Sequence, residues 1–114
     1  MKICIVIPVM NKLQFTKQCL EDLNQTVDKT VEIIVIDNAS TDGTNEYIAT
    51  MKQIKLISNC SNKGCASSWN QGIRASRSEW IVILNNDVRL SKNWLDNLIE
   101  QANENSIDVI SPGM

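Results

Sequence analysis

The sequence alternates short runs of β-branched residues with longer segments of helical periodicity, and no other feature restricts its fold as much. Residues 2–8 (KICIVIP) are almost continuously apolar, which is typical of a strand buried on both faces of a sheet. Similar runs at 31–36, 54–58, 80–84 and 107–110 predict four further strands. Strands that alternate with helices form right-handed βαβ units. We therefore expect an α/β fold, a three-layer, Rossmann-like sandwich around a mainly parallel sheet.

Cap-type residues mark the starts of the helices between these strands. Asn11, with Gln14 three residues later, matches a capping box and predicts a helix that begins there. Further helices are expected from residues 40–42 to about 51, from residues 62–64 to about 76, and after Ser91.

The composition excludes several classes of protein. The 114 residues fit one domain spanning 1–114, and a net charge of −2 gives no electrostatic reason to bind nucleic acid or an anionic membrane. No segment approaches the ~20 apolar residues of a membrane span, and the N-terminal apolar run lacks a small-residue cleavage site. We expect a cytoplasmic protein with no nucleic-acid partner.

The cysteines and tryptophans are interpreted as packing residues. The chain has four cysteines and no histidine, and the cysteine spacing matches no zinc or redox motif. Cys4 and Cys19 fall in predicted secondary structure, where a free thiol behaves as a small hydrophobic group. Trp69, Trp80 and Trp94 are expected in the core or at an interface.

Polar side chains follow three of the predicted strands. Asn11 lies after the first strand, Asp37 directly after the second, and residues 85–87 (NND) after the fourth. Ligands of open α/β sheets bind beyond the carboxyl ends of the strands, where the strand order reverses. If the first strand lies between the second and the fourth, these loops meet over one crevice. Because such groups are costly to desolvate, we expect them to face a polar ligand or water.

Four segments together resemble glycosyltransferase family 2. They are 5–11 (IVIPVMN), 35–44 (VIDNASTDGT), 62–64 (NKG) with 70–72 (NQG), and 84–87 (LNND), in the family's order and spacing over almost the whole chain. The resemblance implies the GT-A fold and identifies the chain as the N-terminal, nucleotide-sugar-binding portion of an inverting enzyme. The acceptor half and its general base are expected to be absent, so the truncated chain would transfer little sugar.

The resemblance also assigns roles to individual residues. The loop from Pro8 to Asn11 would contact the nucleotide base, and Asp37 would accept hydrogen bonds from the base or the ribose. As an alternative, Asp37 supports the turn at 40–44 as an Asx-turn or capping residue, and a capping role is favoured for Asp42. The implied nucleotide-binding residues are Pro8, Val9, Asn11, Asp37, Asn62, Lys63, Gly64, Asn85 and Asn86.

Asp87 corresponds to the last acid of the family's D-x-D motif, which holds Mn²⁺ or Mg²⁺ against the diphosphate. Such a cation needs only one or two carboxylates when phosphate oxygens and water complete its shell, and it would act as a Lewis acid. Asn85 replaces the first acid of the motif, so we expect the cation to bind appreciably only together with the nucleotide. The alternatives are a cap for Asp87, a solvated side chain for Lys63 and a packing role for Gly72.

The implied reaction is metal-dependent transfer of a sugar from a nucleotide-diphosphate sugar, of the UDP or dTDP type, to an acceptor hydroxyl. In the full-length protein the acceptor would be a glycan or a lipid-linked glycan of polysaccharide biosynthesis, with the protein peripheral at the membrane. A non-catalytic nucleotide-sugar-binding or regulatory module is the alternative. The truncated face would favour a homo-oligomer. A dinucleotide dehydrogenase is disfavoured, since no G-x-G-x-x-G follows the first strand.

Overall fold

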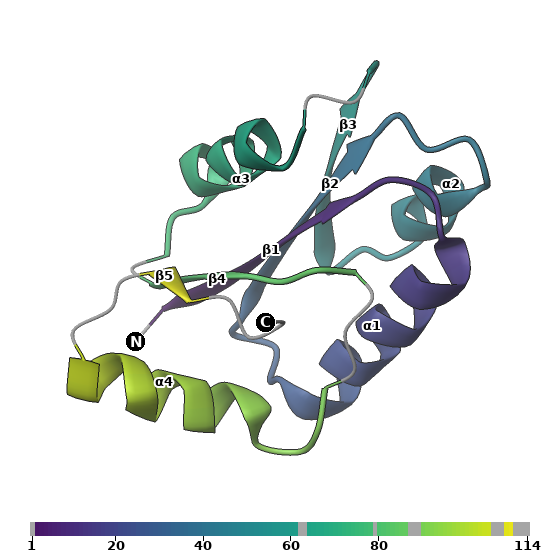
Figure 1. The fold of residues 1–114 in the computed structure, drawn as a ribbon. Coiled ribbons are helices and arrows are strands. Elements are labelled where there is room, and N and C mark those ends of the chain that lie inside the picture. Colours follow the sequence, from purple (N-terminus) through teal and green to yellow (C-terminus); the bar gives the residue numbers. More distant parts are fainter. Residues whose placement is uncertain (1, 62–63, 79, 87–89, 106–108, 111–114) are drawn as a thin grey trace.

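A computed structural model describes residues 2–61, 64–78, 80–86, 90–105 and 109–110. Five strands and four helices alternate along these residues, and Figure 1 shows the helices on both sides of the sheet. The elements are β1 (Ile3–Val9), α1 (Leu13–Thr26), β2 (Glu32–Asn38), α2 (Thr44–Ala49), β3 (Ile54–Asn59), α3 (Gly64–Ala75), β4 (Trp80–Ile83), α4 (Trp94–Asn105) and β5 (Val109–Ile110).

The sheet has the strand order β3-β2-β1-β4-β5, and all its pairs are parallel. β1 therefore lies between β2 and β4, as the sequence required for a common crevice. Val9 at the end of β1 is opposite Asp37 of β2, and Val6 is opposite Ile83 of β4. The carboxyl ends of these three strands consequently lie along one edge of the sheet, and the expected α/β architecture is confirmed.

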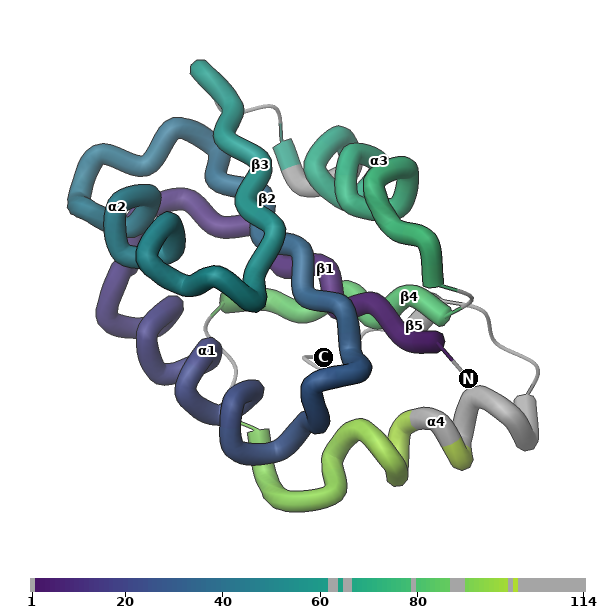
Figure 2. Tube along the Cα trace, turned by 180° about the vertical axis from the view of Figure 1, so that it is seen from behind, coloured from purple at the N-terminus to yellow at the C-terminus, as the bar shows by residue number. Residues whose placement is uncertain are grey.

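Alternate residues of β1 enter two different hydrophobic cores. Ile5, Ile7 and Val9 pack with residues of α1, α2 and α4, whereas Cys4 and Val6 pack on the other face with neighbours from β2 and β4. α3 covers this second face, opposite the other helices (Figure 2). Successive side chains of a strand point to opposite faces, so a strand in the middle of a three-layer sandwich must be apolar throughout.

The capping box predicted at Asn11 is wrong. α1 begins at Leu13, and its cap residue, Lys12, has a left-handed backbone (φ 57°) and makes no capping hydrogen bond through its side chain. Asn11 is also left-handed, with φ 58°. Its side-chain oxygen accepts a hydrogen bond from the backbone of Thr41, so it is committed to another loop and cannot cap its own helix.

Several element boundaries also differ from the predictions by one to a few residues, among them the ends of β2 and α2. β2 continues for two residues beyond Ile36, since Asp37 and Asn38 pair with Ser58 and Asn59 of β3. α2 ends before the predicted Met51, because its last turn tightens through a hydrogen bond from the Met51 N–H to the carbonyl of Ile48. The pairing of β2 with β3, rather than the polarity of the side chains, therefore decides where β2 ends.

The expected packing roles hold for some of the cysteines and tryptophans. Cys4 and Cys19 are buried free thiols, and Trp94 lies in the core. Trp69 does not join the core, because it is 36% exposed on the outer side of α3. Cys60 is an exposed free thiol.

Within the part of the chain that the structure describes, no helix is both long and apolar enough to span a lipid bilayer.

At Gly72, α3 lies close against the sheet. A Cβ atom at this position would lie 2.3 Å from Val6 Cγ1 and 3.1 Å from Ile36 Cδ1. Both neighbours are fully buried in the sheet, so neither can move without disturbing the core. The packing role considered for Gly72 is thus directly visible.

We predict that Gly72→Ala destabilises the protein by about 1–3 kcal/mol, because overpacking outweighs the gain in helix propensity. Urea unfolding measures the change. Ser67→Ala, at an exposed position of the same helix, controls for helix propensity and should not destabilise. Equal or higher stability of Gly72→Ala would contradict the close approach.

Candidate functional site

The loops after β1 and β2 are joined into one unit around Ser40. The Asn11 N–H donates to Ser40 Oγ at 2.8 Å, and Ser40 Oγ donates to Asp37 Oδ1 at 2.5 Å. The Ser40 N–H reaches the same carboxylate oxygen at 3.1 Å, and the Thr41 N–H donates to Asn11 Oδ1 at 2.7 Å. Neither loop can therefore adopt its conformation independently of the other.

Asp42 connects the starts of two helices. Its Oδ2 accepts the Leu13 N–H of α1 at 3.0 Å, and its Oδ1 accepts the N–H and the hydroxyl of Thr44 in α2 at 3.2 and 2.5 Å. The hydrogen bond from the Thr44 hydroxyl, aided by those from the two backbone N–H groups and opposed by desolvation, lowers the pKa of Asp42 below its ordinary value. Asp42 thus accepts N–H groups at the starts of both helices, in keeping with the capping role favoured from the sequence, although the N-cap residue of α2 itself is Gly43.

Asp37 is a carboxylate held in place at the end of β2, with only 2% of its surface exposed. Besides the two bonds from Ser40, its Oδ2 accepts Asn45 Nδ2 at 2.8 Å, and the same amide donates to Ser58 Oγ at 2.7 Å. A carboxylate offers about four acceptor positions, so these three donors leave room for about one more. Asp37 thus supports the 40–44 turn, as its alternative interpretation proposed, and keeps some acceptor capacity.

Asn38 points to the opposite face of the sheet and belongs to a second polar network. Its Nδ2 donates to Ser68 Oγ of α3 at 2.7 Å, and its Oδ1 accepts Asn59 Nδ2 at 2.8 Å. Asn59 and Gln71 exchange two hydrogen bonds of 2.9 Å each, and Ser68 donates to the carbonyl of Gly64 at 2.9 Å. This network fixes the first turns of α3 against the ends of β2 and β3.

The polar residues Asn45, Ser58, Asn59, Ser68 and Gln71 were missed as parts of the site. Ser58 and Asn59 end β3, and polar residues at a strand end are the same signal that identified Asp37 after β2. Applied to the third strand, this signal would have found Ser58 and Asn59. The residues of α2 and α3 do not follow a strand, although Gln71 falls in the 70–72 (NQG) segment of the family resemblance.

The start of α3 lies at this edge because the helix follows β3. Gly64 has a positive φ (81°), and a Cβ atom there would have nothing within 4 Å, so its surroundings are open. The N-terminus of a 12-residue helix presents N–H groups and positive potential. Asn62 and Lys63, expected to contact the diphosphate, lie outside the described residues.

The end of β4 reaches the same edge. The Leu84 N–H donates to the carbonyl of Val6 at 3.0 Å, which places Asn85 directly after a strand that flanks β1. Asn85 is exposed, whereas the side chain of Asn86 donates to Thr16 Oγ1 of α1 at 3.0 Å. Asp87, the expected cation ligand, lies outside the described residues.

The remaining predicted residues belong to the end of β1. Pro8 is half-buried, and Met10 is exposed. The side chain of Val9 packs in the core, which leaves its backbone for any contact with a ligand. The structure thus brings Pro8, Val9, Asn11 and Asp37 together, with Gly64 and Asn85 along the same edge.

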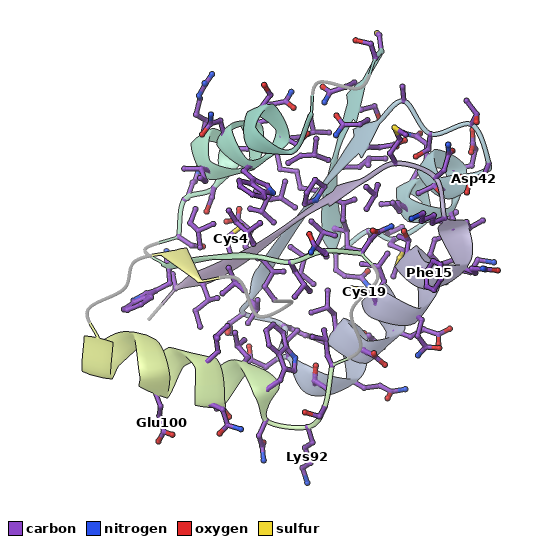
Figure 3. All side chains as sticks on the ribbon, viewed as in Figure 1. Cys4, Phe15, Cys19, Asp42, Lys92 and Glu100 are labelled. Atoms are coloured by element: carbon purple, nitrogen blue, oxygen red, sulfur yellow. The ribbon has the colours of Figure 1, made fainter. Side chains whose placement is uncertain are left out.

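Among the described residues, this edge carries no cluster of metal ligands. A hollow of about 760 Å³ lies beside the amino ends of β2 and β3, lined among others by Leu23, Val27, Val31 and Ile54. Within the described ranges, no group of three or more potential metal ligands occurs. Lys92 and Glu100 are remote, pointing away from the sheet on the side of α4 (Figure 3).

We predict that Ser40→Ala lowers the stability by about 1–3 kcal/mol, because the Asn11 N–H loses its acceptor and Asp37 loses a donor. Urea unfolding of the variant gives the value. Ser61→Ala, an exposed serine near the same edge, is the matched control and should behave as the wild type. An unchanged stability of Ser40→Ala would show that the two loops do not depend on this hydroxyl.

We predict that Asp42→Asn makes the protein less sensitive to acid. Because folding lowers the pKa of Asp42 below 3.8, its contribution to stability is complete above that value and disappears as the pH falls through the folded pKa. Urea unfolding at a series of pH values should show a smaller loss for Asp42→Asn than for the wild type. Parallel curves for the two proteins would contradict the pKa shift.

Comparison with known proteins accounts for this arrangement. The model of the family described as "Glycosyl transferase family 2" matches residues 4–114. The glycosyltransferase GlyG of Streptococcus pneumoniae is 26% identical over 112 residues, which are 95% of this chain and 37% of GlyG. The chain thus spans about a third of the length of this relative.

Two solved structures have the same fold at 22% identity. Residues 1–349 of TarS from S. aureus superpose with a TM-score of 0.79 over 91% of this chain and 33% of that one. The mannosyltransferase PcManGT of Pyrobaculum calidifontis, solved with GDP-Man and Mn²⁺, gives 0.78 over 88% of this chain and 32% of that one. With a GT-A fold and a family match over nearly its whole length, the chain belongs to glycosyl transferase family 2.

Proposed function

We propose that this chain binds the donor of a sugar transfer, a nucleoside diphosphate sugar, at the carboxyl edge of its sheet. The observation that carries the proposal is the buried carboxylate of Asp37, oriented by Ser40 and Asn45 where the loops after β1 and β2 meet. Family membership supports sugar transfer as the reaction. The transfer would invert the anomeric carbon and deliver the sugar to an acceptor hydroxyl.

The nucleoside end of the donor is assigned to Asp37 and the loop after β1. An ionised carboxylate only accepts hydrogen bonds, which suits the N–H of a uracil or thymine base or a ribose hydroxyl. With 2% of its surface exposed, Asp37 is accessible only to such a slim donor group. Met10, which is exposed within this loop, would contact the base from the same side. We therefore favour a UDP- or dTDP-type donor.

The diphosphate is assigned to the segment that opens α3 and to the loop after β4. Backbone N–H groups at a helix N-terminus favour anions, and Lys63 adds a positive charge. Asp87 would hold Mn²⁺ or Mg²⁺, which would stabilise the departing diphosphate as a Lewis acid. The residues fit a cation that depends on its nucleotide: Asn85 removes one charge from the motif, and the described ranges offer no cluster of three ligands. PcManGT, of similar fold, was solved with Mn²⁺ and a nucleotide sugar.

The acceptor side and the general base are assigned to the part of such proteins that this chain does not span. An inverting transfer needs a base that removes the proton of the attacking hydroxyl. Asp37 and Asp42 are engaged by their own loops, and Glu100 points away from the sheet. We accordingly expect this segment alone to bind the donor and to transfer little sugar.

We predict that UDP or dTDP with Mn²⁺ raises the thermal unfolding midpoint, since a ligand at 100 times its Kd stabilises the folded state by about 2.7 kcal/mol. Asp87→Ala should lose the Mn²⁺-dependent part of this increase. Asp28→Ala, which removes an exposed carboxylate at the opposite edge, should retain it. No increase with any nucleoside diphosphate, or an undiminished increase in Asp87→Ala, would refute the site. Binding by a full-length relative without sugar transfer would instead favour a non-catalytic module.

A further inference from the structure

One side of α1 carries polar residues that are buried. Thr16 and Asp22 are 1% and 6% exposed, and Thr26 follows on the same side of the helix. The apolar residues Leu20 and Leu23 of α1 pack in the core beside them. A buried carboxylate is costly unless hydrogen bonds compensate its lost hydration. The groups that contact Asp22 must therefore stabilise its buried carboxylate.

Three hydrogen bonds connect this side of α1 to the segment after β4. Asn86 Nδ2 donates to Thr16 Oγ1 at 3.0 Å, the Leu90 N–H donates to Asp22 Oδ2 at 3.0 Å, and Trp94 Nε1 donates to Thr26 Oγ1 at 2.8 Å. In every case the residue of α1 is the acceptor. We call these three bonds the α1 ladder.

The α1 ladder has a direction. Residues 86, 90 and 94 contact residues 16, 22 and 26 in the same order, so these described positions after β4 follow α1 from its first turns to its last. Figures 1 and 2 agree that α4 starts beside the end of α1. The ladder thus attaches residues 86, 90 and 94 to one helix in a fixed order.

Asp22 is the strongest member of the ladder. It supplies a charged acceptor to a backbone N–H, and hydrogen bonds to an ionised group are about twice as strong as neutral ones. Gln18 Nε2 donates to its other oxygen at 3.2 Å, which fixes the rotation of the carboxylate. The Thr26 hydroxyl donates to the Asp22 carbonyl at 2.7 Å and so turns an acceptor position toward Trp94.

We propose that Asp22, helped by Thr16, is a positioning residue for the cation-binding part of the donor site. The bonds to Asn86 and Leu90 fix the chain one residue before and three residues after Asp87. This inference rests on the proposed role of Asp87. Groups that orient the ligands of a metal typically contribute 10–100-fold to its affinity, and Asp22 would act on Asp87 through the backbone that flanks it.

The test compares Asp22→Ala with Asp22→Asn and with Glu21→Ala. The asparagine keeps an oxygen that can accept the Leu90 N–H, whereas the alanine does not. Glu21 is the adjacent, exposed carboxylate of the same helix and controls for the loss of a charge. Two properties are measured at a temperature where circular dichroism shows every variant folded: hydrogen exchange of the Leu90 amide, and UDP affinity with Mn²⁺ and with EDTA.

Asp22→Ala should accelerate exchange at Leu90 and reduce the Mn²⁺-dependent gain in UDP affinity by about tenfold or more. UDP affinity in EDTA should fall much less, because Asp37 and its loops are not part of the ladder and Asn86 keeps its bond to Thr16. Asp22→Asn should recover most of the gain in affinity, and Glu21→Ala should match the wild type. A general structural role would instead weaken UDP binding equally with and without Mn²⁺.

Two results would overturn the inference: unchanged Leu90 exchange in Asp22→Ala, or equal losses of UDP affinity with Mn²⁺ and with EDTA. Failure of the proposed function is distinguishable from both, because the wild type itself would then show no Mn²⁺-dependent gain. That outcome would also refute a role of Asp22 in positioning a cation site. The exchange of the Leu90 amide would still show whether Asp22 holds the chain at Leu90.

Discussion

The burial of β1 on both faces is the constraint on which the rest of the structure depends. Its side chains alternate between the core under α3 and the core under α1, α2 and α4, and its backbone pairs with β2 on one side and β4 on the other. Because the pairs are parallel, three strand ends and the loops that follow them converge on one edge. The polar side chains of the site therefore lie at that edge, because the packing of the hydrophobic core fixes where the strands end.

The polar groups at that edge stabilise one another. Asp37 and Asn38 are neighbours in sequence but face opposite sides of the sheet, and each is bonded to a different helix, α2 through Asn45 and α3 through Ser68. Ser58 and Asn59 of β3 extend both networks by one strand. Satisfied networks of this kind orient their members before a ligand arrives, which reduces the ordering that binding would otherwise require.

Much of the fold was predictable because it follows from local patterns. The apolar runs indicated the strands, and their alternation with helices indicated a parallel sheet; the central position of β1 entered only as a condition, which the strand order meets. Asp37 and the loop after β1 were also predictable as members of one edge. The capping box at Asn11 failed because the partner of its side chain is Thr41, thirty residues away. Asn45, Ser68 and Gln71 were not predictable for the same reason, since each contacts residues that only the folded chain brings near.

The linkage of the β1–α1 and β2–α2 loops has a consequence for how such sites can vary. Residue 11 both donates to Ser40 and accepts from Thr41, while the start of α1 depends on Asp42. A changed side chain in one loop therefore leaves a backbone group of the other without its partner. Positions 11, 40 and 42 should covary among related sequences, and transplanting either loop from a homologue would require transplanting both.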